Sequence, residues 1–138
     1  ISDETIDVIM SNCVINLSPD KERVYKEAFR VLKNGGRIFV ADIVLAKELP
    51  DFIKNNTSAY IGCIAGALAK DEYLSIIRKA GFADVQILKE TIFPIDFIIS
   101  EDIKCNISKN THSSIDLTKN IEDLQKSILS ILVSAKKL

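Results

Sequence analysis

The feature that most constrains the fold is a pair of short apolar runs separated by one amphipathic helix. Ile6 to Met10 (IDVIM) and Arg37 to Ile43 (RIFVADI) are almost continuous in apolar residues, a pattern typical of strands buried on both faces of a parallel sheet. Between them the apolar residues recur at helical spacing, at Val24, Ala28, Val31 and Leu32. Such strand, helix, strand units nearly always form a right-handed crossover between parallel strands. The chain therefore predicts an α/β fold.

Local signals predict where the first helix begins and ends. Ser18 is a favourable N-cap residue and Pro19 suits the first helical position. Asn34, Gly35 and Gly36 tolerate positive φ, so we expect them to close the helix just before the second strand.

The rest of the chain predicts a second helix, two further strands and an irregular segment. We expect the helix from Lys70 to Ala80 and a third strand from Ala83 to Lys89. Ile128 to Lys136 is apolar and rich in β-formers, which indicates a closing strand. Ile121 to Gln125 reads as a helical turn, and the polar residues 104–119 read as a long loop.

Composition excludes several classes of partner. The 138 residues are 47% hydrophobic with only three prolines and five glycines, which is typical of one globular domain with a real core and argues against disorder. Eighteen basic and nineteen acidic residues leave a net charge of −1, so we expect neither nucleic-acid nor membrane binding. No apolar stretch reaches the roughly 20 residues that span a bilayer. The expected partners are small molecules or other proteins.

The cysteines and the first residues indicate the compartment and the origin of the chain. Three widely spaced cysteines do not form the framework of a small secreted domain, so we expect a reducing, cytoplasmic environment. The chain starts at Ile1 without an initiator methionine or a signal-peptide pattern. We interpret it as a trimmed or clipped molecule.

The order of these elements and the turn between them resemble a known family. A strand, the string Ser11 to Leu17 (SNCVINL), the string SPDK and a helix ending in Val31 to Gly36 (VLKNGG) resemble the middle of class I methyltransferases, which usually carry proline in place of Asn34. The resemblance implies the C-terminal half of a Rossmann-like methyltransferase, with a mostly parallel sheet and a final antiparallel strand. It assigns residues 1–92 to that half domain and residues 93–138 to a C-terminal extension with the closing strand.

Two cysteine motifs give a sharper match within that family. SNCVINL around Cys13 and Gly62 to Ala67 (GCIAGA) around Cys63 resemble the two downstream cysteine motifs of arsenite methyltransferases, and the resemblance extends from Ile6 to about Lys89. It implies that Cys13 and Cys63 hold trivalent arsenic as the methyl acceptor. Soft, thiophilic arsenic prefers thiolate ligands, and Cys13 follows the carboxyl end of a strand, where open α/β sheets bind ligands.

The resemblance also implies a cofactor and a reaction. S-adenosylmethionine would be the methyl donor, with Ser11 and Asn12 contacting its methionine end, and the arsenic lone pair would attack the methyl group. The protein then acts by positioning and desolvation, so we expect no catalytic side chain, no metal and no role for His112. The family's glycine-rich loop would lie upstream of Ile1. We therefore expect weak or no cofactor binding and no activity from the isolated chain.

Other interpretations remain open for individual residues. Each cysteine could be a small buried hydrophobe, and Cys105 matches no motif. Asn12 and Asn16 could satisfy the backbone of a turn. Asp42 could face the crevice at the strand ends or cap a following turn.

The function of the chain also has alternatives. It could belong to a methyltransferase for a quinone or another small acceptor, although the two cysteine motifs argue against this. It could instead be a non-catalytic assembly module, which the absence of a glycine-rich loop favours. Because IDVIM carries only Asp7 to protect an open edge, we also expect the chain to form a homo-oligomer.

Overall fold

The structure of the chain is a computed structural model that describes residues 1–49, 64, 66–94 and 122–138. Within these ranges one sheet has the strand order β1-β2-β4-β3. Its strands are β1 (Ile6–Asn12), β2 (Leu32–Leu45), β3 (Ala83–Ile92) and β4 (Ile128–Lys136). β1 and β2 are parallel, and β4 is antiparallel to both β2 and β3. This confirms the expected α/β fold with a final antiparallel strand.

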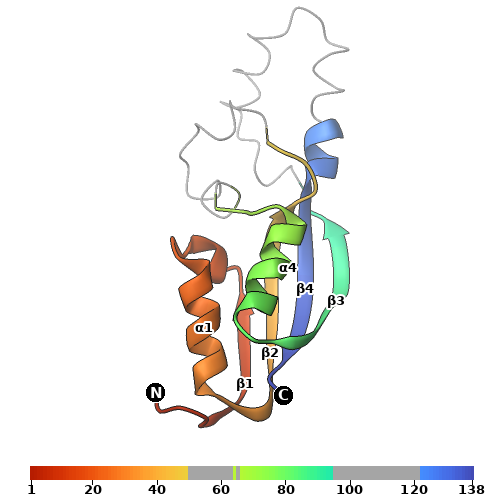
Figure 1. Ribbon diagram of the computed structural model, residues 1–138. Coiled ribbons are helices and arrows are strands. Elements are labelled where there is room, and N and C mark those ends of the chain that lie inside the picture. Colours follow the sequence, from red (N-terminus) through yellow and green to blue (C-terminus); the bar gives the residue numbers. More distant parts are fainter. Residues whose placement is uncertain (50–63, 65, 95–121) are drawn as a thin grey trace, which may run out of the picture.

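Both described long helices cover the same face of the sheet. α1 (Lys21–Val31) and α4 (Lys70–Lys79) lie side by side in front of the strands (Figure 1). The short 3-10 helix η1 (Ile15–Leu17) joins β1 to α1, and residues 122–127 are helical just before β4. None of the helices in the described ranges is long and apolar enough to cross a bilayer.

The core lies between these helices and the sheet. Ile38 and Val40 of β2 and Val133 of β4 are each 1% exposed, because alternate residues of a strand point to the helix-covered face. From the helix side, the ring of Phe29 packs edge-on against Phe82 with centroids 5.2 Å apart. This contact packs α1 against the turn between α4 and β3.

β1 differs from its prediction in burial. Ile6 to Met10 was expected to be covered on both faces, but Val8 is 51% exposed and Met10 is 80% exposed. Among the described strands only β2 pairs with β1, so β1 forms an edge of the sheet. An apolar run indicates a strand whose side chains can be buried. Whether they are buried depends on the strands and helices that pack against it.

The beginning of α1 also differs from its prediction. Asp20 is the N-cap, and its side chain accepts a hydrogen bond from the Arg23 backbone N–H at 2.9 Å. Ser18 and Pro19 therefore lie before the helix. Both Ser and Asp are good caps, but an ionised Asp also interacts favourably with the positive end of the helix dipole.

The junction of α1 and β2 is tighter than the sequence indicates. β2 begins at Leu32, directly after α1, and so includes the residues expected to form a separate turn. Gly35 adopts the positive φ expected there, at 84°. Gly36 has a different constraint, since a Cβ atom at this position would lie 2.8 Å from the Lys33 carbonyl oxygen.

The later elements follow their predictions closely. α4 ends one residue before the expected Ala80, β3 extends three residues beyond Lys89, and β4 has the expected bounds. The expected loop at 104–119 lies outside the described residues. Because β4 lies between β2 and β3, the closing strand shares a sheet with the first 92 residues. The division of the chain at residue 92 stays a prediction.

A buried lysine ties the end of the chain to α1. Lys137 is 7% exposed, and its ammonium donates to the carbonyl oxygens of Phe29 at 3.0 Å and Leu32 at 2.8 Å. The same ammonium lies 4.7 Å from the centre of the Phe29 ring. The two chain termini lie at the end of the sheet opposite the carboxyl ends of β1 and β2 (Figure 1).

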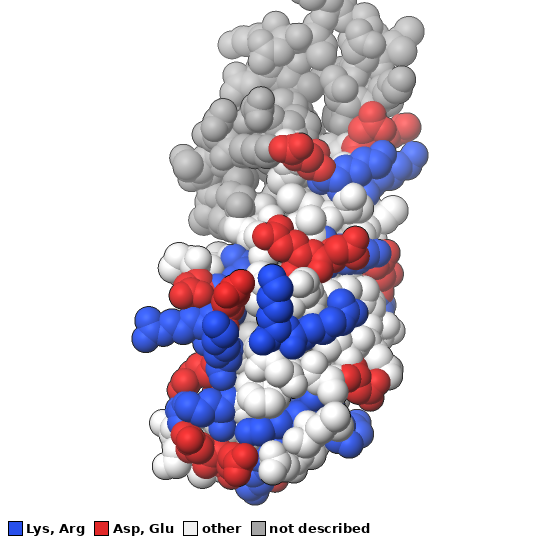
Figure 2. Space-filling model, viewed as in Figure 1, with Lys and Arg blue, Asp and Glu red and all other residues white. Residues whose placement is uncertain are grey.

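Charges of both signs cover the helix side of the molecule. Lys and Arg side chains alternate with Asp and Glu side chains over α1 and α4 in the view of Figure 2. On this face no large area of one sign is seen, which agrees with the nearly balanced charge of the sequence.

Candidate functional site

The residues expected to bind ligands begin where β1 ends. Ser11 and Asn12 are the last residues of β1 and pair with Val40 and Ala41 of β2. Ser11 is half-buried and Asn12 is exposed. Because β1 and β2 are parallel, their carboxyl ends lie at the same edge of the sheet, which is where open α/β sheets bind ligands.

Cys13 follows at this edge with an unusual backbone conformation. The residue is half-buried and has a φ of 57°, in the left-handed region that costs L-residues other than glycine about 1–2 kcal/mol. Its backbone N–H donates to the Ala41 carbonyl oxygen at 2.8 Å. Strained residues of this kind persist only where the surrounding structure holds them, and they are common at functional sites.

Asn16, in η1, connects this segment to β2 a second time. The residue is 2% exposed, and its Nδ2 donates to the Ile43 carbonyl oxygen at 2.6 Å. The expectation that Asn16 could satisfy a backbone group agrees with this contact. The carbonyl belongs to a distant strand, however, and not to a local turn.

Asp42 departs from both of its expected roles. It neither faces the crevice nor caps a turn, since it is 1% exposed and its Oδ2 accepts a hydrogen bond from the Tyr73 hydroxyl at 2.6 Å. Asp42 lies on the same face of β2 as the core residues Val40 and Val44, two positions from each. The pleat of the strand therefore directs its carboxylate under the helices.

The network continues from Asp42 to both helices. The Tyr25 hydroxyl of α1 donates to the Tyr73 hydroxyl of α4 at 2.6 Å, and the two rings pack at 90° with centroids 6.0 Å apart. Both tyrosines are fully buried. Tyr25, Tyr73 and Asp42 thus form one chain of hydrogen bonds that joins α1, α4 and β2.

Burial controls the protonation of this network. It raises the pKa of the Asp42 carboxyl, although the Tyr73 hydrogen bond and the charge of Lys21 act in the opposite direction. Burial also raises the pKa of the Tyr25 and Tyr73 phenols, and the nearby Asp42 charge adds to both rises. The two hydroxyls are therefore protonated donors at neutral pH.

Two buried side-chain oxygens in this part of the structure have no hydrogen-bond partner. They are Asn16 Oδ1 and Asp42 Oδ1, both buried. A buried acceptor without a partner costs about 1–3 kcal/mol, and such atoms are rare enough in folded proteins to need a reason. Their presence beside the strand ends singles out this part of the core.

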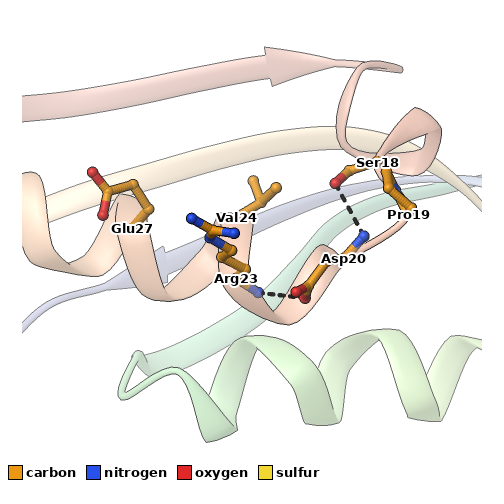
Figure 3. Close-up of a pocket in the computed structure, with 6 residues that line it drawn as sticks. All are labelled: Ser18, Pro19, Asp20, Arg23, Val24 and Glu27. Carbon is orange, nitrogen blue, oxygen red and sulfur yellow. Dashed lines mark hydrogen bonds between the residues drawn. The ribbon is translucent and has the colours of Figure 1, made fainter.

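A shallow groove lies next to the start of α1, apart from these residues. Its volume is about 430 Å3, and its lining residues are Ser18, Pro19, Asp20, Arg23, Val24 and Glu27. Figure 3 shows that the hydrogen bonds within it are those that cap the helix, from Asp20 N–H to Ser18 Oγ and from Arg23 N–H to Asp20. The groove includes none of the predicted site residues.

The second cysteine motif is only partly described. Cys63, Cys105 and His112 lie outside the described residues. From that motif the structure describes Ile64, which is 1% exposed and accepts a hydrogen bond from the Ala67 N–H at 3.0 Å. In the described part of the chain, no group of three or more His, Cys, Asp or Glu residues could hold a metal ion.

Tyr25 and Tyr73 were not expected to form a polar network. Tyr73 lies within the helix predicted from Lys70 to Ala80, and Tyr25 lies within the first predicted helix, and neither was a candidate site residue. A usable signal was present, because an Asp inside the apolar run RIFVADI must find a donor when the strand is buried. Tyrosines on the covering helices are residues that can supply one.

Comparison with known proteins identifies the family. The family described as methyltransferase domain matches residues 1–81, more than half of the chain. The chain belongs to the methyltransferase domain family. The residues matched include β1, η1, α1, β2 and α4, so the carboxyl edge with Cys13 and the buried network both belong to this domain.

The curated relatives of this methyltransferase domain confirm the resemblance to arsenite methyltransferases. The arsenite methyltransferase of Halobacterium salinarum is 39% identical over 87 residues, which cover 63% of this chain and 22% of the relative. The human arsenite methyltransferase is 38% identical over 95 residues, covering 69% of this chain and 25% of the relative. The chain thus spans about a quarter of the length of these relatives.

Solved structures agree with the fold. An arsenic(III) S-adenosylmethionine methyltransferase from Chlamydomonas reinhardtii is 30% identical with a TM-score of 0.71, and the match covers 99% of this chain and 39% of that one. A phosphoethanolamine N-methyltransferase from Haemonchus contortus has a TM-score of 0.66 at 16% identity, covering 99% of this chain and 35% of that one. The second match shows the class I methyltransferase fold alone.

Proposed function

We propose that this chain is the part of an S-adenosylmethionine-dependent arsenite methyltransferase that supplies thiolate ligands for trivalent arsenic. The observation that carries the proposal is the identity of 38–39% to arsenite methyltransferases together with Cys13 at the carboxyl edge of the sheet. Cys13 therefore stands, with a left-handed backbone, at the edge where open α/β sheets bind ligands.

Two thiolates would hold the arsenic. Cys13 supports this role because it is half-buried at the edge where ligands bind. Cys63 is proposed as the second ligand on the strength of its motif, GCIAGA. Because trivalent arsenic has a strong preference for sulfur, two thiolates held by one fold can retain it against water.

The edge residues fit one side of the cofactor. Ser11 and Asn12 offer a hydroxyl and an exposed amide at the end of β1, which suit the charged methionine end of S-adenosylmethionine. When bound, S-adenosylmethionine supplies an electrophilic methyl group. The chain has no Gly-x-Gly-x-Gly string to hold the rest of the molecule, so the described residues fit only part of it.

The chemistry required of this chain is mainly positioning. The acceptor lone pair on arsenic needs no general base, so the thiolates have to hold the metalloid at the correct distance and direction. Asp42, Tyr25 and Tyr73 are too deeply buried to touch a substrate. They stabilise the elements on which Cys13 stands.

A non-catalytic assembly module is the second candidate. The missing glycine-rich string favours it for this stretch of sequence, and it predicts that the thiols bind no arsenical. A methyltransferase for a quinone-type acceptor would share the fold and would also have no use for paired thiols.

Binding of phenylarsine oxide to the reduced 138-residue chain tests the proposal. Two thiols and one phenylarsine oxide give two As–S bonds and one water, without a change of oxidation state. Because the second bond forms at high effective concentration, Cys13→Ser and Cys63→Ser should each weaken binding by more than about tenfold. The readouts are titration calorimetry and the mass of the adduct.

Cys105→Ser is the matched control, because it removes a thiol that belongs to no motif. It should leave the affinity unchanged. A loss with Cys105→Ser as large as that with Cys13→Ser would show that the ligand assignment is wrong. Absence of binding by the wild-type chain would favour the assembly module or the quinone-type enzyme.

A further inference from the structure

The segment that carries Cys13 is attached to β2 at two points. The Cys13 N–H donates to the Ala41 carbonyl oxygen at 2.8 Å, and Asn16 Nδ2 donates to the Ile43 carbonyl oxygen at 2.6 Å. These two carbonyls flank Asp42 along the strand. The short stretch from Cys13 to Asn16 is therefore fastened at both of its ends.

The Asn16 attachment is made inside the protein. Asn16 is 2% exposed and Ile15 beside it is 6% exposed, so water competes little for the Asn16 amide. Hydrogen bonds in such surroundings are electrostatically stronger than those in water. The backbone N–H of Asn16 also interacts with the Asp42 carboxyl of β2, so a change of the Asn16 side chain removes the bond to Ile43 and leaves this backbone contact in place.

The strand to which Asn16 is attached is itself held firmly. Asp42 accepts from Tyr73 of α4, and Tyr73 accepts from Tyr25 of α1. Two helices thus fix the part of β2 between the Ala41 and Ile43 carbonyls. The end of β2 provides a rigid base for the Cys13 segment.

The strained conformation of Cys13 depends on such attachment. A φ of 57° lies in a region that a residue with a Cβ adopts only when its surroundings impose it. If one attachment were lost, the backbone could relax toward the common negative φ. The Cα–Cβ bond of Cys13, and with it the thiol, would then point elsewhere.

We infer that Asn16 is a positioning residue for Cys13, whose hydrogen bond to the Ile43 carbonyl keeps the thiol directed at the arsenic site. The inference rests on the proposed function, since it concerns how the Cys13 ligand is presented. Asn16 itself does not touch the arsenic. Its unpartnered Oδ1 is consistent with a residue kept for this geometry at some cost in stability.

The test compares phenylarsine oxide binding by Asn16→Leu, Asn16→Ala and the wild-type chain. Leu fills a similar volume and removes both the donor and the unpartnered oxygen, so Asn16→Leu should stay folded. A displaced ligand atom costs roughly tenfold or more in a site that works by positioning. We expect that loss of affinity in both variants. Binding is measured at a temperature below the thermal unfolding midpoint of the less stable variant.

Lys137→Met is the control for a general loss of stability, because Lys137 contacts Leu32 and Gly36 at the start of β2, whereas Cys13 contacts Ala41 toward its carboxyl end. It should lower the unfolding midpoint and leave the affinity for phenylarsine oxide within about twofold, since distant sites act independently. The double variant Cys13→Ser, Asn16→Leu should bind phenylarsine oxide as weakly as Cys13→Ser alone, because both changes act on the same ligand.

The outcomes separate the inference from the proposed function. No arsenical binding by the wild-type chain would count against the proposed function. Wild-type affinity in Asn16→Leu, or a further loss when it is added to Cys13→Ser, would overturn the inference while the proposed function stands. Failure of both Asn16 variants to fold would also overturn it, because Asn16 would then be a purely structural residue.

Discussion

At the scale of single residues, the unusual feature is a carboxylate inside the core. Asp42 accepts a hydrogen bond from Tyr73, and the backbone N–H of Asn16 also favours its ionised form, while its second oxygen has no partner within hydrogen-bond distance. Buried polar groups are costly when only partly satisfied. The raised pKa of Asp42 indicates that protonation is how the fold reduces this cost.

Asp42→Asn tests this interpretation. Since burial raises the pKa of Asp42, the folded protein binds its proton more tightly than the unfolded chain. The associated stability is therefore complete at acid pH and is lost as the pH rises through the pKa of the folded state. Asn keeps an acceptor for Tyr73 and is uncharged at every pH, so it avoids the cost of burying the ionised carboxylate. We expect Asp42→Asn to raise the free energy of unfolding at neutral pH by about 1–3 kcal/mol.

Urea unfolding between about pH 4 and pH 8 measures the effect, since this interval begins at the ordinary carboxyl pKa. The pH dependence should be flatter in Asp42→Asn than in the wild-type chain. Asp71→Asn, at an exposed carboxylate in the first turn of α4, is the matched control and should change the stability by no more than the roughly 0.3–1 kcal/mol of its interaction with the helix dipole. Lower stability of Asp42→Asn at every pH would mean that the ionised carboxylate is required.

At the scale of elements, the end of α1 depends on a residue far along the chain. α1 passes into β2 without an intervening loop, and the last carbonyls of a helix lack partners within it. Lys137 supplies hydrogen bonds to the carbonyls of Phe29 and Leu32. A positive charge at this end is also favourable for the helix dipole.

Lys137→Met should therefore destabilise the protein although it adds an apolar side chain. The change leaves buried carbonyl oxygens without their donor, so we expect a loss of about 1–3 kcal/mol in the free energy of unfolding. Thermal and urea unfolding followed by circular dichroism measure it. Lys136→Met, at the half-buried neighbouring lysine, is the control and should have a much smaller effect. Equal losses in both variants would contradict the role given to Lys137.

The ion pair between Lys137 and Glu4 is a minor contribution. Its atoms are 3.3 Å apart, but the Glu4 side chain is 55% exposed. Solvent screens such pairs, and they contribute little to stability. The carbonyl contacts are therefore the ones that matter at the end of α1.

At the scale of the whole molecule, the two edges of the described sheet differ. β3 carries charged residues and has two irregularities in its pairing with β4, features that protect an edge from pairing with other chains. β1 has one charge, Asp7, and exposes Val8 and Met10. The β1 edge is the less protected of the two.

We therefore expect the 138-residue chain to form a homodimer or a higher oligomer through β1. Multi-angle light scattering at micromolar concentration measures the mass. Met10→Lys should reduce association, because a charge on an edge strand opposes strand pairing. Leu88→Lys, at an exposed apolar position of the other edge strand, β3, where the residue is 52% exposed, should not. A stable wild-type monomer would contradict this expectation.

Much of the architecture could be predicted from the sequence because it depends on local pattern. The bounds of β4 and most of α4 follow from apolar spacing and from residues that end a helix. The α/β fold follows from a helix between two apolar runs. Local signals were weaker for the start of α1, where Ser18 and Asp20 are both suitable caps and the helix uses the second.

The candidate site also has a part that the sequence predicts and a part that only the folded structure shows. The motif SNCVINL and its place after a strand are properties of the sequence alone, and they determined Cys13, Ser11 and Asn12 as candidates. The open edge at Ile6–Met10 was also expected, and β1 lies at the end of the described sheet. The left-handed backbone of Cys13, the attachment of Asn16 to Ile43 and the chain from Tyr25 to Asp42 were decided by tertiary structure. Each depends on residues that are far apart in the chain and meet only after folding, so no local periodicity can encode them.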